Sequence, residues 1–477
     1  MSDGDQENQL VPHDTAADSV SSAHGVGNPV RSHLFVVLEC DRPLAGGARY
    51  SLEGVEKVVI GRGRERSAHY ECSNGLHRLK VLVPGARMSA IHATITKVGA
   101  DDWELVDNDS TNGVQVNGRS ISRSILADGD CIQLGRTIFT IRKAQPTPLQ
   151  APTILDFLID KPQTPGLATL NPGIAKTYDE LARIAVSDLP VVLSGDTGTG
   201  KEVIAQALHR LSGRKGPFVA VNCGALPAVL IESLLFGHVK GAFSGSIRDE
   251  VGFVRSAEGG TLFLDEIAEL PRSSQVVFLR VLQESEVVPL GSPRSHKVDV
   301  RVIAAAQRPL YELVGGRDFR EDLRARLEGH SVHLAPLAQR REDLGIIIAA
   351  ILGRLCDCPP PLHPHVGRLF WQYDWPLNIR ELEMVLRHAI ALATGGGPIQ
   401  QHQLPAGLGK CDVGMVALTE QPAPLSSEDL ELRTQVEHWL RIHQGNISEV
   451  ARATGKARTQ IQRWMRKFHL RADDYRH

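Results

Sequence analysis

The sequence predicts a multidomain protein with an all-β sandwich, an α/β domain that carries a helical lid, and a small all-α module. Short apolar runs separated by turn residues fill residues 33–142, which is typical of a β-sandwich. Near residue 195 an apolar strand leads through a glycine-rich loop into a helix, whereas residues 426–477 have only helical periodicity. The 477 residues also exceed the usual size of one domain, about 100–200 residues.

The composition excludes several classes of protein. Hydrophobic residues make up 42% and charged residues 23%, which is the range of folded domains and not of disordered or coiled-coil chains. Lys and Arg number 53 against 55 Asp and Glu, so a basic nucleic-acid-binding surface is expected only locally. No stretch resembles a signal peptide or a membrane span, and we expect a cytoplasmic protein without membrane contact. Seven scattered cysteines indicate reduced thiols.

The N-terminal part begins with a polar lead and continues as strands. Residues 1–30 hold almost no bulky apolar side chains, so they cannot build a core. Strands are expected at apolar runs such as 34–38 and 138–141. Five prolines between residues 144 and 168 indicate a linker, with a short apolar insert at 154–159.

The central part alternates apolar strands with helical segments, which predicts a parallel sheet. From about Asp343 the strands stop, and helical patterns continue to about Leu408 as a lid. The expected boundaries are 1–30 for the lead, 31–143 for the sandwich, 144–166 for a linker, 167–345 for the α/β part, 346–410 for the lid, 411–425 for a second linker and 426–477 for the helical module.

The glycine-rich loop has the pattern of a phosphate-binding loop. It reads Gly195-Asp196-Thr197-Gly198-Thr199-Gly200-Lys201. Glycines let backbone N–H groups wrap the phosphates, and the lysine neutralises them. Because a strand precedes the loop and a helix follows it, we favour a nucleotide site over an ordinary glycine turn. Glu202 stands where a magnesium-binding hydroxyl is usual.

A second element completes the predicted nucleotide site. The apolar strand at 261–264 ends in Asp265 and Glu266. Asp265 is expected to hold Mg²⁺ through water, and Glu266 to polarise the attacking water. Loop and acids together predict ATP hydrolysis.

At this point residues 167–410 resemble the AAA+ domain of bacterial enhancer-binding proteins, the activators of sigma-54 RNA polymerase, in which a glutamate after the loop lysine is usual. The segment 241–246 resembles their GAFTGA signature loop, although its pattern alone would also suit an ordinary surface loop. The resemblance assigns the contact with sigma-54 to Gly241, Ala242, Phe243, Ser244, Gly245 and Ser246.

The same resemblance implies further roles at matching positions. Asn222 would restrain Glu266, and Arg380 in the lid would contact the nucleotide. Arg320 and Arg326 would reach the nucleotide of the next subunit, which implies a homo-oligomer, from dimer to hexameric ring. ATP and Mg²⁺ are the implied cofactors.

Several positions depart from the family pattern. Ser244 replaces threonine and Ser246 replaces alanine in the signature loop, so contact with sigma-54 is expected to be weakened or retuned. Gln307 replaces the sensor asparagine after Ala306, and Leu377 replaces a glycine in the lid.

Residues 33–142 resemble a forkhead-associated (FHA) domain, a phosphothreonine reader. The motifs are Ile60-Gly61-Arg62, Ser89-Ala90-Ile91-His92 and Asp109-Ser110-Thr111-Asn112-Gly113. Arg62, Ser89 and Thr111 would hold the phosphate and Asn112 the peptide backbone, while His92 would brace the loops. Ala90 removes one usual phosphate contact, so a sandwich used only for assembly is the alternative.

The last segment resembles a Fis-type helix-turn-helix domain. Asn446 and Glu449 form a candidate helix cap, and Gly455 separates two short helices. Seven Lys or Arg and no acid lie between residues 452 and 471, which favours DNA binding. The candidate DNA-facing residues are Arg458, Thr459, Gln462, Arg463, Arg466 and Lys467.

Together these resemblances imply a sigma-54-dependent transcriptional activator with two-component-like signalling. Its expected partners are upstream enhancer DNA, sigma-54 RNA polymerase, and a phosphothreonine protein or Ser/Thr kinase; the phosphothreonine could also lie on this chain, at Thr147 or Thr153. The alternatives are an ATP-modulated DNA-binding regulator or repressor that does not act on sigma-54, and a phosphopeptide-recruited scaffold.

Overall fold

The computed structural model describes residues 28–73, 75–158, 164, 166–314, 319–393, 397–408, 427–444, 446–467, 470 and 475. They belong to two compact units, Met1–Cys411 and Asp412–His477. The expected lead and the second linker lie almost wholly outside the described residues, although Val30 already begins a strand. Among the described helices, none combines the length and the apolar character needed to cross a bilayer.

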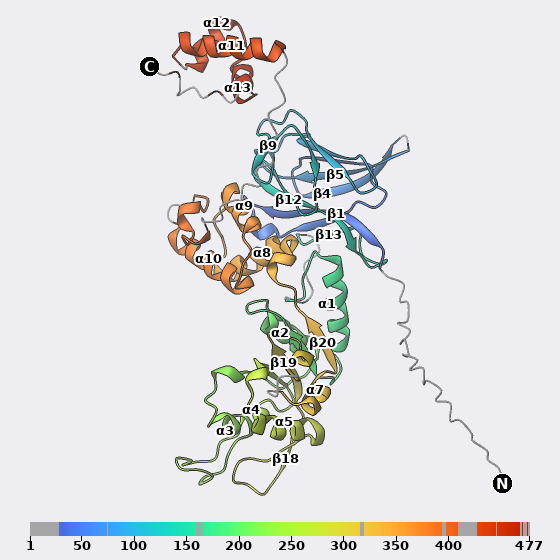
Figure 1. Ribbon diagram of the computed structural model, residues 1–477, viewed down its shortest axis with the longest axis vertical. Coiled ribbons are helices and arrows are strands. Elements are labelled where there is room, and N and C mark those ends of the chain that lie inside the picture. The colour runs from blue at the N-terminus through green and yellow to red at the C-terminus, as the bar shows by residue number, and fades with distance from the viewer. Residues whose placement is uncertain are drawn as a thin grey trace, which may run out of the picture. The chain divides into compact units, whose positions relative to one another are not determined.

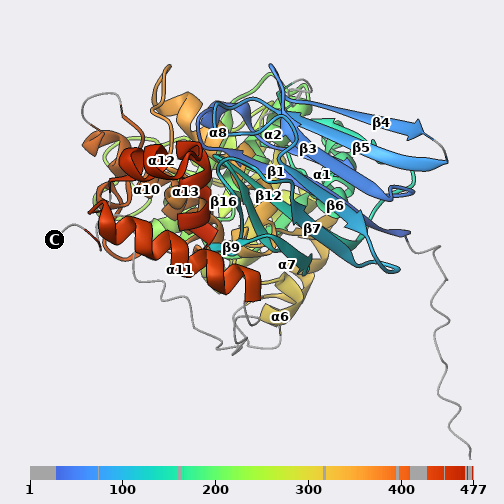
Figure 2. The same cartoon turned by 90° about the horizontal axis from the view of Figure 1, so that it is seen from above.

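The N-terminal domain is a sandwich of two sheets, drawn in blue to teal in Figures 1 and 2. In spatial order the first sheet is β13 (Ile154–Asp156), β2 (Ala48–Ser51), β1 (Val30–Glu39), β12 (Thr137–Pro146), β11 (Cys131–Leu134), β8 (Val114–Val116) and β9 (Arg119–Ile121). The second is β10 (Arg123–Leu126), β7 (Trp103–Asp107), β6 (Ala93–Lys97), β3 (Lys57–Arg62), β5 (Leu76–Val83) and β4 (Ser67–Ser73). Apolar side chains from both sheets form one buried core between them.

The structure differs from the predicted linker at 144–166. Strand β12 runs on to Pro146, and β13 pairs with β2, so the first sheet includes part of that segment. The carboxylate of Asp156 is paired with the fully buried guanidinium of Arg66, which fixes β13 to the sandwich. Thr147 is only 1% exposed, which places its hydroxyl out of reach of a kinase in this fold.

The central domain contains the predicted parallel sheet, here of five strands. Their spatial order is β15 (Phe218–Asn222), β16 (Thr261–Asp265), β19 (Arg301–Ala306), β14 (Val191–Ser194) and β20 (His330–His333). The helices are α1 (Pro172–Ile184), α2 (Lys201–Leu211), α3 (Ile231–Phe236), α4 (Phe253–Ser256), α5 (Arg272–Glu284), α6 (Leu310–Val314) and α7 (Glu321–Leu327), with a small hairpin of β17 (Glu286–Val287) and β18 (His296–Lys297). The carboxyl ends of parallel strands form the usual ligand edge of such a sheet.

The helical lid follows β20 through two short 3₁₀ turns, η4 (Leu337–Gln339) and η5 (Arg341–Asp343). Its helices are α8 (Leu344–Leu355), α9 (Pro364–Gln372) and α10 (Asn378–Leu392). Their buried face is continuous with apolar side chains of the first sheet of the sandwich.

The described part of the C-terminal unit has three helices, α11 (Ser427–Ile442), α12 (Ile447–Thr454) and α13 (Arg458–Lys467), shown in red in Figure 2. The predicted cap at Asn446 is confirmed, because its side-chain oxygen accepts hydrogen bonds from the N–H groups of Ser448 and Glu449. Gly455 ends α12 in the left-handed conformation. The buried core consists of Val436, Leu440, Val450, Ile461 and Met465.

Candidate functional site

The phosphate-binding loop joins the end of β14 to the start of α2, as the sequence predicts. Gly195, Gly198 and Gly200 have φ angles of 142°, 80° and 103°, which side chains other than glycine rarely adopt. A Cβ atom on Gly198 would lie 2.2 Å from the carbonyl oxygen of Leu377 in the lid. The loop therefore needs glycine both for its turns and for the close approach of the lid.

Lys201 opens α2 with its side chain folded back over the loop. Its Nζ donates hydrogen bonds to the carbonyl oxygens of Gly195, at 2.6 Å, and Asp196, at 3.1 Å. Partial burial lowers the pKa of Lys201, although the nearby carboxylates of Asp265 and Asp196 oppose this effect. Its ammonium is thus partly shielded from water and close enough to the acids at the end of β16 to interact with them.

Asp265 and Glu266 follow β16 at the carboxyl edge of the sheet. Asp265 lies in register with Asn222 at the end of the neighbouring strand β15. Its Oδ1 accepts a hydrogen bond from the N–H of Glu266, whose backbone is left-handed with φ of 52°. A left-handed backbone is uncommon for a residue other than glycine, and it ends β16 at this position.

The Glu266 carboxylate and the Asn222 side chain both lie close to Gly224. A Cβ atom at Gly224 would be 2.6 Å from Glu266 Oε2 and 3.4 Å from Asn222 Oδ1. In the described part of the chain no hydrogen bond joins Asn222 to Glu266; Asn222 Oδ1 instead accepts from the N–H of Ala225. The restraining role of Asn222 stays a prediction.

Three residues of the lid segment donate hydrogen bonds to three consecutive carbonyl oxygens of the phosphate-binding loop. The Asn378 side-chain amide donates to Thr197 O at 3.0 Å, and the backbone N–H of Ile379 donates to Gly198 O at 3.0 Å. The guanidinium of buried Arg340 donates to Thr199 O at 2.8 Å. We call these three bonds the loop clasp. In these bonds the three carbonyl oxygens of the loop point toward the lid, whereas the N–H of Gly195 donates to Ala306 O at 3.2 Å and that of Thr199 to Asp196 O at 3.4 Å.

Sequence reasoning missed Arg340 and Asn378. Asn378 lies two residues before Arg380 in the segment that resembles the lid sensor, so it could have been singled out there. Arg340 lies in a charged run, Arg340-Arg341-Glu342-Asp343, in which no pattern separates a buried arginine from an exposed one.

The other predicted nucleotide-site residues lie around this centre. Arg380 is exposed at the start of α10, and its Cβ lies 3.0 Å from a Cβ built on Gly198. Glu202 is exposed on α2 and accepts a hydrogen bond from Gln206. Gln307 directly follows β19, next to β14. Asp196 and Thr199 close the loop, since Thr199 Oγ1 donates to Asp196 O at 2.8 Å.

Arg326 lies on α7, and Arg320 is the residue directly before that helix. The guanidinium of Arg320 donates to both carboxylate oxygens of Asp322, at 3.0 and 2.6 Å. Arg326 is exposed and donates to Leu282 O at 3.3 Å. Among the described residues neither guanidinium bonds to the loop that contains Lys201.

The loop at 241–246 lies between α3 and α4. Gly241 and Gly245 have φ angles of 83° and 109° and no neighbour within 4 Å of a built Cβ, which makes the loop open on its outer side. Ser244 is exposed and Phe243 is 38% exposed, with its ring against His238 at 5.0 Å between centroids.

Ser246 ties the two ends of this loop together by hydrogen bonds. Its hydroxyl donates to Phe243 O at 2.8 Å and accepts from Phe243 N–H at 3.1 Å, and the side chain is only 8% exposed. Gly241 N–H also donates to Ser246 O at 3.0 Å, whereas Ala242 N–H bonds to Val239 O. The unusual serine therefore orders the backbone that carries Phe243.

The candidate phosphate-binding residues of the sandwich lie together. The N–H of Arg62 donates to Ser89 O at 2.9 Å, and Ser89 Oγ accepts from Thr111 N–H at 3.2 Å. Asn112 donates from its side chain to Arg87 O at 3.0 Å. Arg62, Thr111 and Asn112 are exposed, as a ligand site requires.

His92 braces these loops, as predicted. Its Nδ1 accepts from Ser89 N–H at 3.0 Å, so its Nε2 carries the proton that bonds to Gly113 O at 3.2 Å. Burial lowers the pKa of His92, which favours the neutral ring.

The candidate DNA-facing residues lie on α13. Arg458 is exposed at its first position. The side chains of Thr459, Gln462, Arg463, Arg466 and Lys467 are outside the described part of the structure.

Known proteins match this chain over most of its length. The Sigma-54 interaction domain family matches residues 167–333. The chain is 36% identical over 326 residues to the transcriptional regulatory protein GlrR of Escherichia coli K12, covering 65% of this chain and 69% of the relative. It is 41% identical over 287 residues to the Sigma54-dependent transcriptional activator SfnR of Pseudomonas putida, covering 57% and 77%. The chain belongs to the sigma-54-dependent transcriptional regulators.

In this regulator the FHA domain family matches residues 58–135, and the AAA+ ATPase lid domain family matches residues 338–414. The predictions of an FHA sandwich and of an AAA+ ATPase with a lid are confirmed. The lid match begins before the expected residue 346 and includes Arg340 of the loop clasp. Among solved structures, NtrX of Brucella abortus in complex with ATP is similar at 26% identity, covering 65% of this chain and 70% of that chain with a TM-score of 0.46.

Proposed function

We propose that this regulator binds upstream DNA and uses ATP hydrolysis to remodel the closed complex of sigma-54 RNA polymerase, under the control of phosphothreonine binding to its FHA domain. The observation that carries the proposal is the joint presence, in one domain, of the acids beside Lys201 and of the ordered loop that presents Phe243. The first supplies hydrolysis, and the second supplies a place where its energy acts on a partner.

In the proposed hydrolysis Lys201 binds the terminal phosphates and Glu266 orients the attacking water. The acids fit Mg²⁺, because hard carboxylate oxygens are its preferred ligands and Asp265 Oδ1 is oriented by the Glu266 N–H. Bound Mg²⁺ would neutralise phosphate charge. Lys201→Ala should abolish nucleotide binding or turnover, and Glu266→Gln should bind ATP but hydrolyse it poorly.

Assembly into a ring is part of the proposal. Arg320 directly precedes α7 and Arg326 lies on it, and among the described residues neither bonds to the phosphate-binding loop of its own chain, which supports a role in the site of the next subunit. Turnover per subunit should therefore rise with protein concentration, and Arg320→Ala should be inactive. Full turnover of this variant at every concentration would contradict the shared site.

Recognition of phosphothreonine is assigned to Arg62, Ser89 and Thr111, with Asn112 on the peptide backbone. Their common placement supports it, since Arg62 ends β3 and bonds to Ser89, and the loops that hold Ser89, Thr111 and Asn112 are joined by His92. DNA binding is assigned to α13, supported by the basic sequence from Arg452 to Arg471 and by the three-helix unit that holds it. Loss of enhancer binding in Arg463→Ala would support that assignment.

The alternative, a DNA-binding regulator that does not act on sigma-54, differs in one outcome. Purified regulator, sigma-54 RNA polymerase, enhancer DNA and ATP should give open promoter complexes. DNA binding and ATP hydrolysis without open complexes would favour the alternative.

A further inference from the structure

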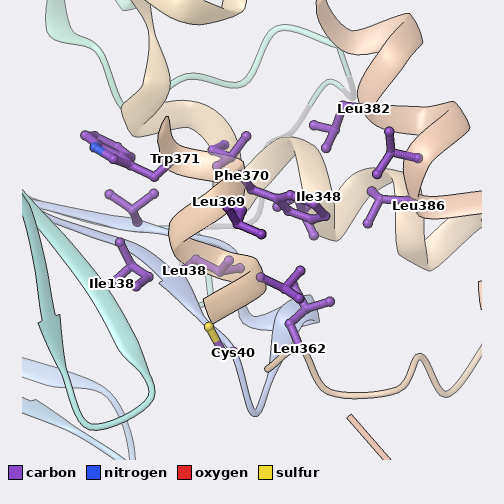
Figure 3. Close-up of a cluster of buried hydrophobic side chains, with 14 of the residues drawn as sticks. Leu38, Cys40, Ile138, Ile348, Leu362, Leu369, Phe370, Trp371, Leu382 and Leu386 are labelled. Atoms are coloured by element: carbon purple, nitrogen blue, oxygen red, sulfur yellow. The ribbon is translucent and has the colours of Figure 1, made fainter. Parts of the chain in front are cut away.

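The hydrophobic core of the lid includes side chains of the FHA sandwich. Six buried side chains of the FHA sandwich belong to the same cluster as the lid helices, namely Phe35, Val37, Leu38, Cys40, Cys131 and Ile138. Figure 3 shows Leu38 of β1, Cys40 of the turn that follows it and Ile138 of β12 beside Ile348, Leu362 and Leu369 of the lid. Each of these is at most 8% exposed, so both partners lose a large apolar face if they separate.

Strand β1 contributes side chains to two hydrophobic cores, that of the sandwich and that of the lid. Leu34 and Val36 face the inside of the sandwich, and Phe35 and Val37 face the lid. Side chains of a strand alternate between its two faces, so a strand that is apolar at every position is buried on both. We call this contact the sandwich–lid joint.

Backbones meet at the joint without room for side chains. A Cβ atom on Gly345, in the first turn of α8, would lie 1.8 Å from Val37 O. A Cβ atom on Gly367 of α9 would lie 2.8 Å from Cys40 Sγ, and Leu362 N–H donates to Cys40 O at 2.7 Å. Contacts this close are typical of one packed core and not of two domains that separate.

Buried polar bonds also cross the joint. Glu342 is fully buried, and its carboxylate accepts from Arg142 at 3.1 Å and from Gln145 at 3.4 Å, both on β12. Arg368 of α9 donates to Gln115 of β8 at 2.9 Å and to Gln133 at 3.2 Å. Gln115 lies three residues after Asn112, so the joint reaches the strand that follows the sandwich loop with Thr111 and Asn112.

We propose that the FHA sandwich is a permanent part of the ATPase lid, and that sandwich and lid move as one body whose loop clasp holds the phosphate-binding loop. A detachable regulatory domain would release an active ATPase when removed; here, removal would expose the lid core and weaken the clasp. The nucleotide part of this inference rests on the proposed ATP site, but the joint itself does not.

The direct test uses the full chain with a protease site inserted between Lys161 and Pro162. After cleavage, the fragments 1–161 and 162–477 should stay together in size-exclusion chromatography at micromolar concentration and should bind a fluorescent ATP analogue as before. Separation of the two fragments would overturn the proposal, whether or not the larger fragment still binds nucleotide. Failure of the ATP site alone would appear as intact pairs that bind no nucleotide.

Two matched substitutions on α8 sharpen the test. Gly345→Ala should release the sandwich after cleavage and weaken binding of the ATP analogue about ten-fold or more, since the clasp would no longer be held. Gly353→Ala, on the same helix with its nearest neighbour 3.9 Å from a built Cβ, should change neither. Release in both variants or in neither would contradict the joint; circular dichroism of the uncut chains checks that both fold.

Discussion

Asn378 should be a positioning residue of the ATP site, because it connects the start of α10 with the phosphate-binding loop and with η4. Its side chain is 2% exposed, with Nδ2 donating to Thr197 O and Oδ1 accepting from Leu337 N–H at 2.8 Å. Its backbone is left-handed, with φ of 54°, a conformation that asparagine tolerates better than alanine. Asn378→Ala should therefore lose more than one hydrogen bond.

The expected cost of Asn378→Ala follows from these contacts. The bond to Thr197 contributes about 1 kcal/mol, and the buried Leu337 N–H left without an acceptor costs about 1–3 kcal/mol. Forcing alanine into the left-handed region adds about 1 kcal/mol. The sum is about 3–5 kcal/mol, shared between the free energy of unfolding and the affinity for ATP.

Asn378→Asp tests the donor to Thr197 while keeping the acceptor for Leu337. Aspartate tolerates the left-handed backbone, but it cannot donate to Thr197 O and places a buried negative charge beside that carbonyl oxygen. It should therefore lower the thermal stability as well as weaken ATP binding about ten-fold or more. Calorimetry of unfolding and titration with a fluorescent ATP analogue measure both quantities. An Ala variant with unchanged melting temperature and unchanged affinity would refute the loop clasp.

Three further predictions concern other parts of the chain. Burial, with the charge of Glu342, raises the pKa of Asp343 to about 7, so between about pH 4 and 7 the folded chain holds a proton that the unfolded chain has lost. The contribution of Asp343 to stability should therefore fall as the pH rises through this range. Asp343→Asn should melt at a higher temperature than the wild type at pH 8 but not at pH 5. Ser246→Ala should speed hydrogen exchange at the amide of Phe243 without changing basal ATP turnover, whereas the exposed Ser244→Ala should not; equal exchange in both would argue against the hydroxyl tie. Arg62→Ala should lower affinity for a phosphothreonine peptide about ten-fold or more, and an unchanged affinity would leave the sandwich as an assembly module.

Sequence patterns revealed those parts of the ATP site that lie close together along the chain. Gly195 to Lys201 form one continuous motif, and Asp265 with Glu266 ends an apolar strand, so local reasoning reached both. Arg340 and Asn378 reach the same loop from more than a hundred residues away, and their role depends on the path of the chain between. Ser246 was noticed as an unusual residue, but its bonds to Phe243 depend on the turn that Gly241 and Gly245 allow.

The sandwich–lid joint left a signal that the sequence analysis did not use. The run from Leu34 to Leu38 is apolar at every position, which indicates a strand buried on both faces, yet an isolated sandwich would leave one face exposed to water. Strand β13 left only the short apolar insert at 154–159, because three strand residues between prolines carry little periodicity and are fixed by the pairing of Asp156 with the distant Arg66. Contacts between residues so far apart in the sequence can be identified only from the packed structure.

The most direct test of the proposed function is open-complex formation at a sigma-54 promoter with purified polymerase, enhancer DNA and ATP. Wild-type regulator should give open complexes with ATP and none with a non-hydrolysable analogue. Phe243→Ala should hydrolyse ATP at the wild-type rate and give none. Wild-type regulator that binds the enhancer and hydrolyses ATP but opens no promoter, or Phe243→Ala that opens it normally, would contradict the proposed action on sigma-54.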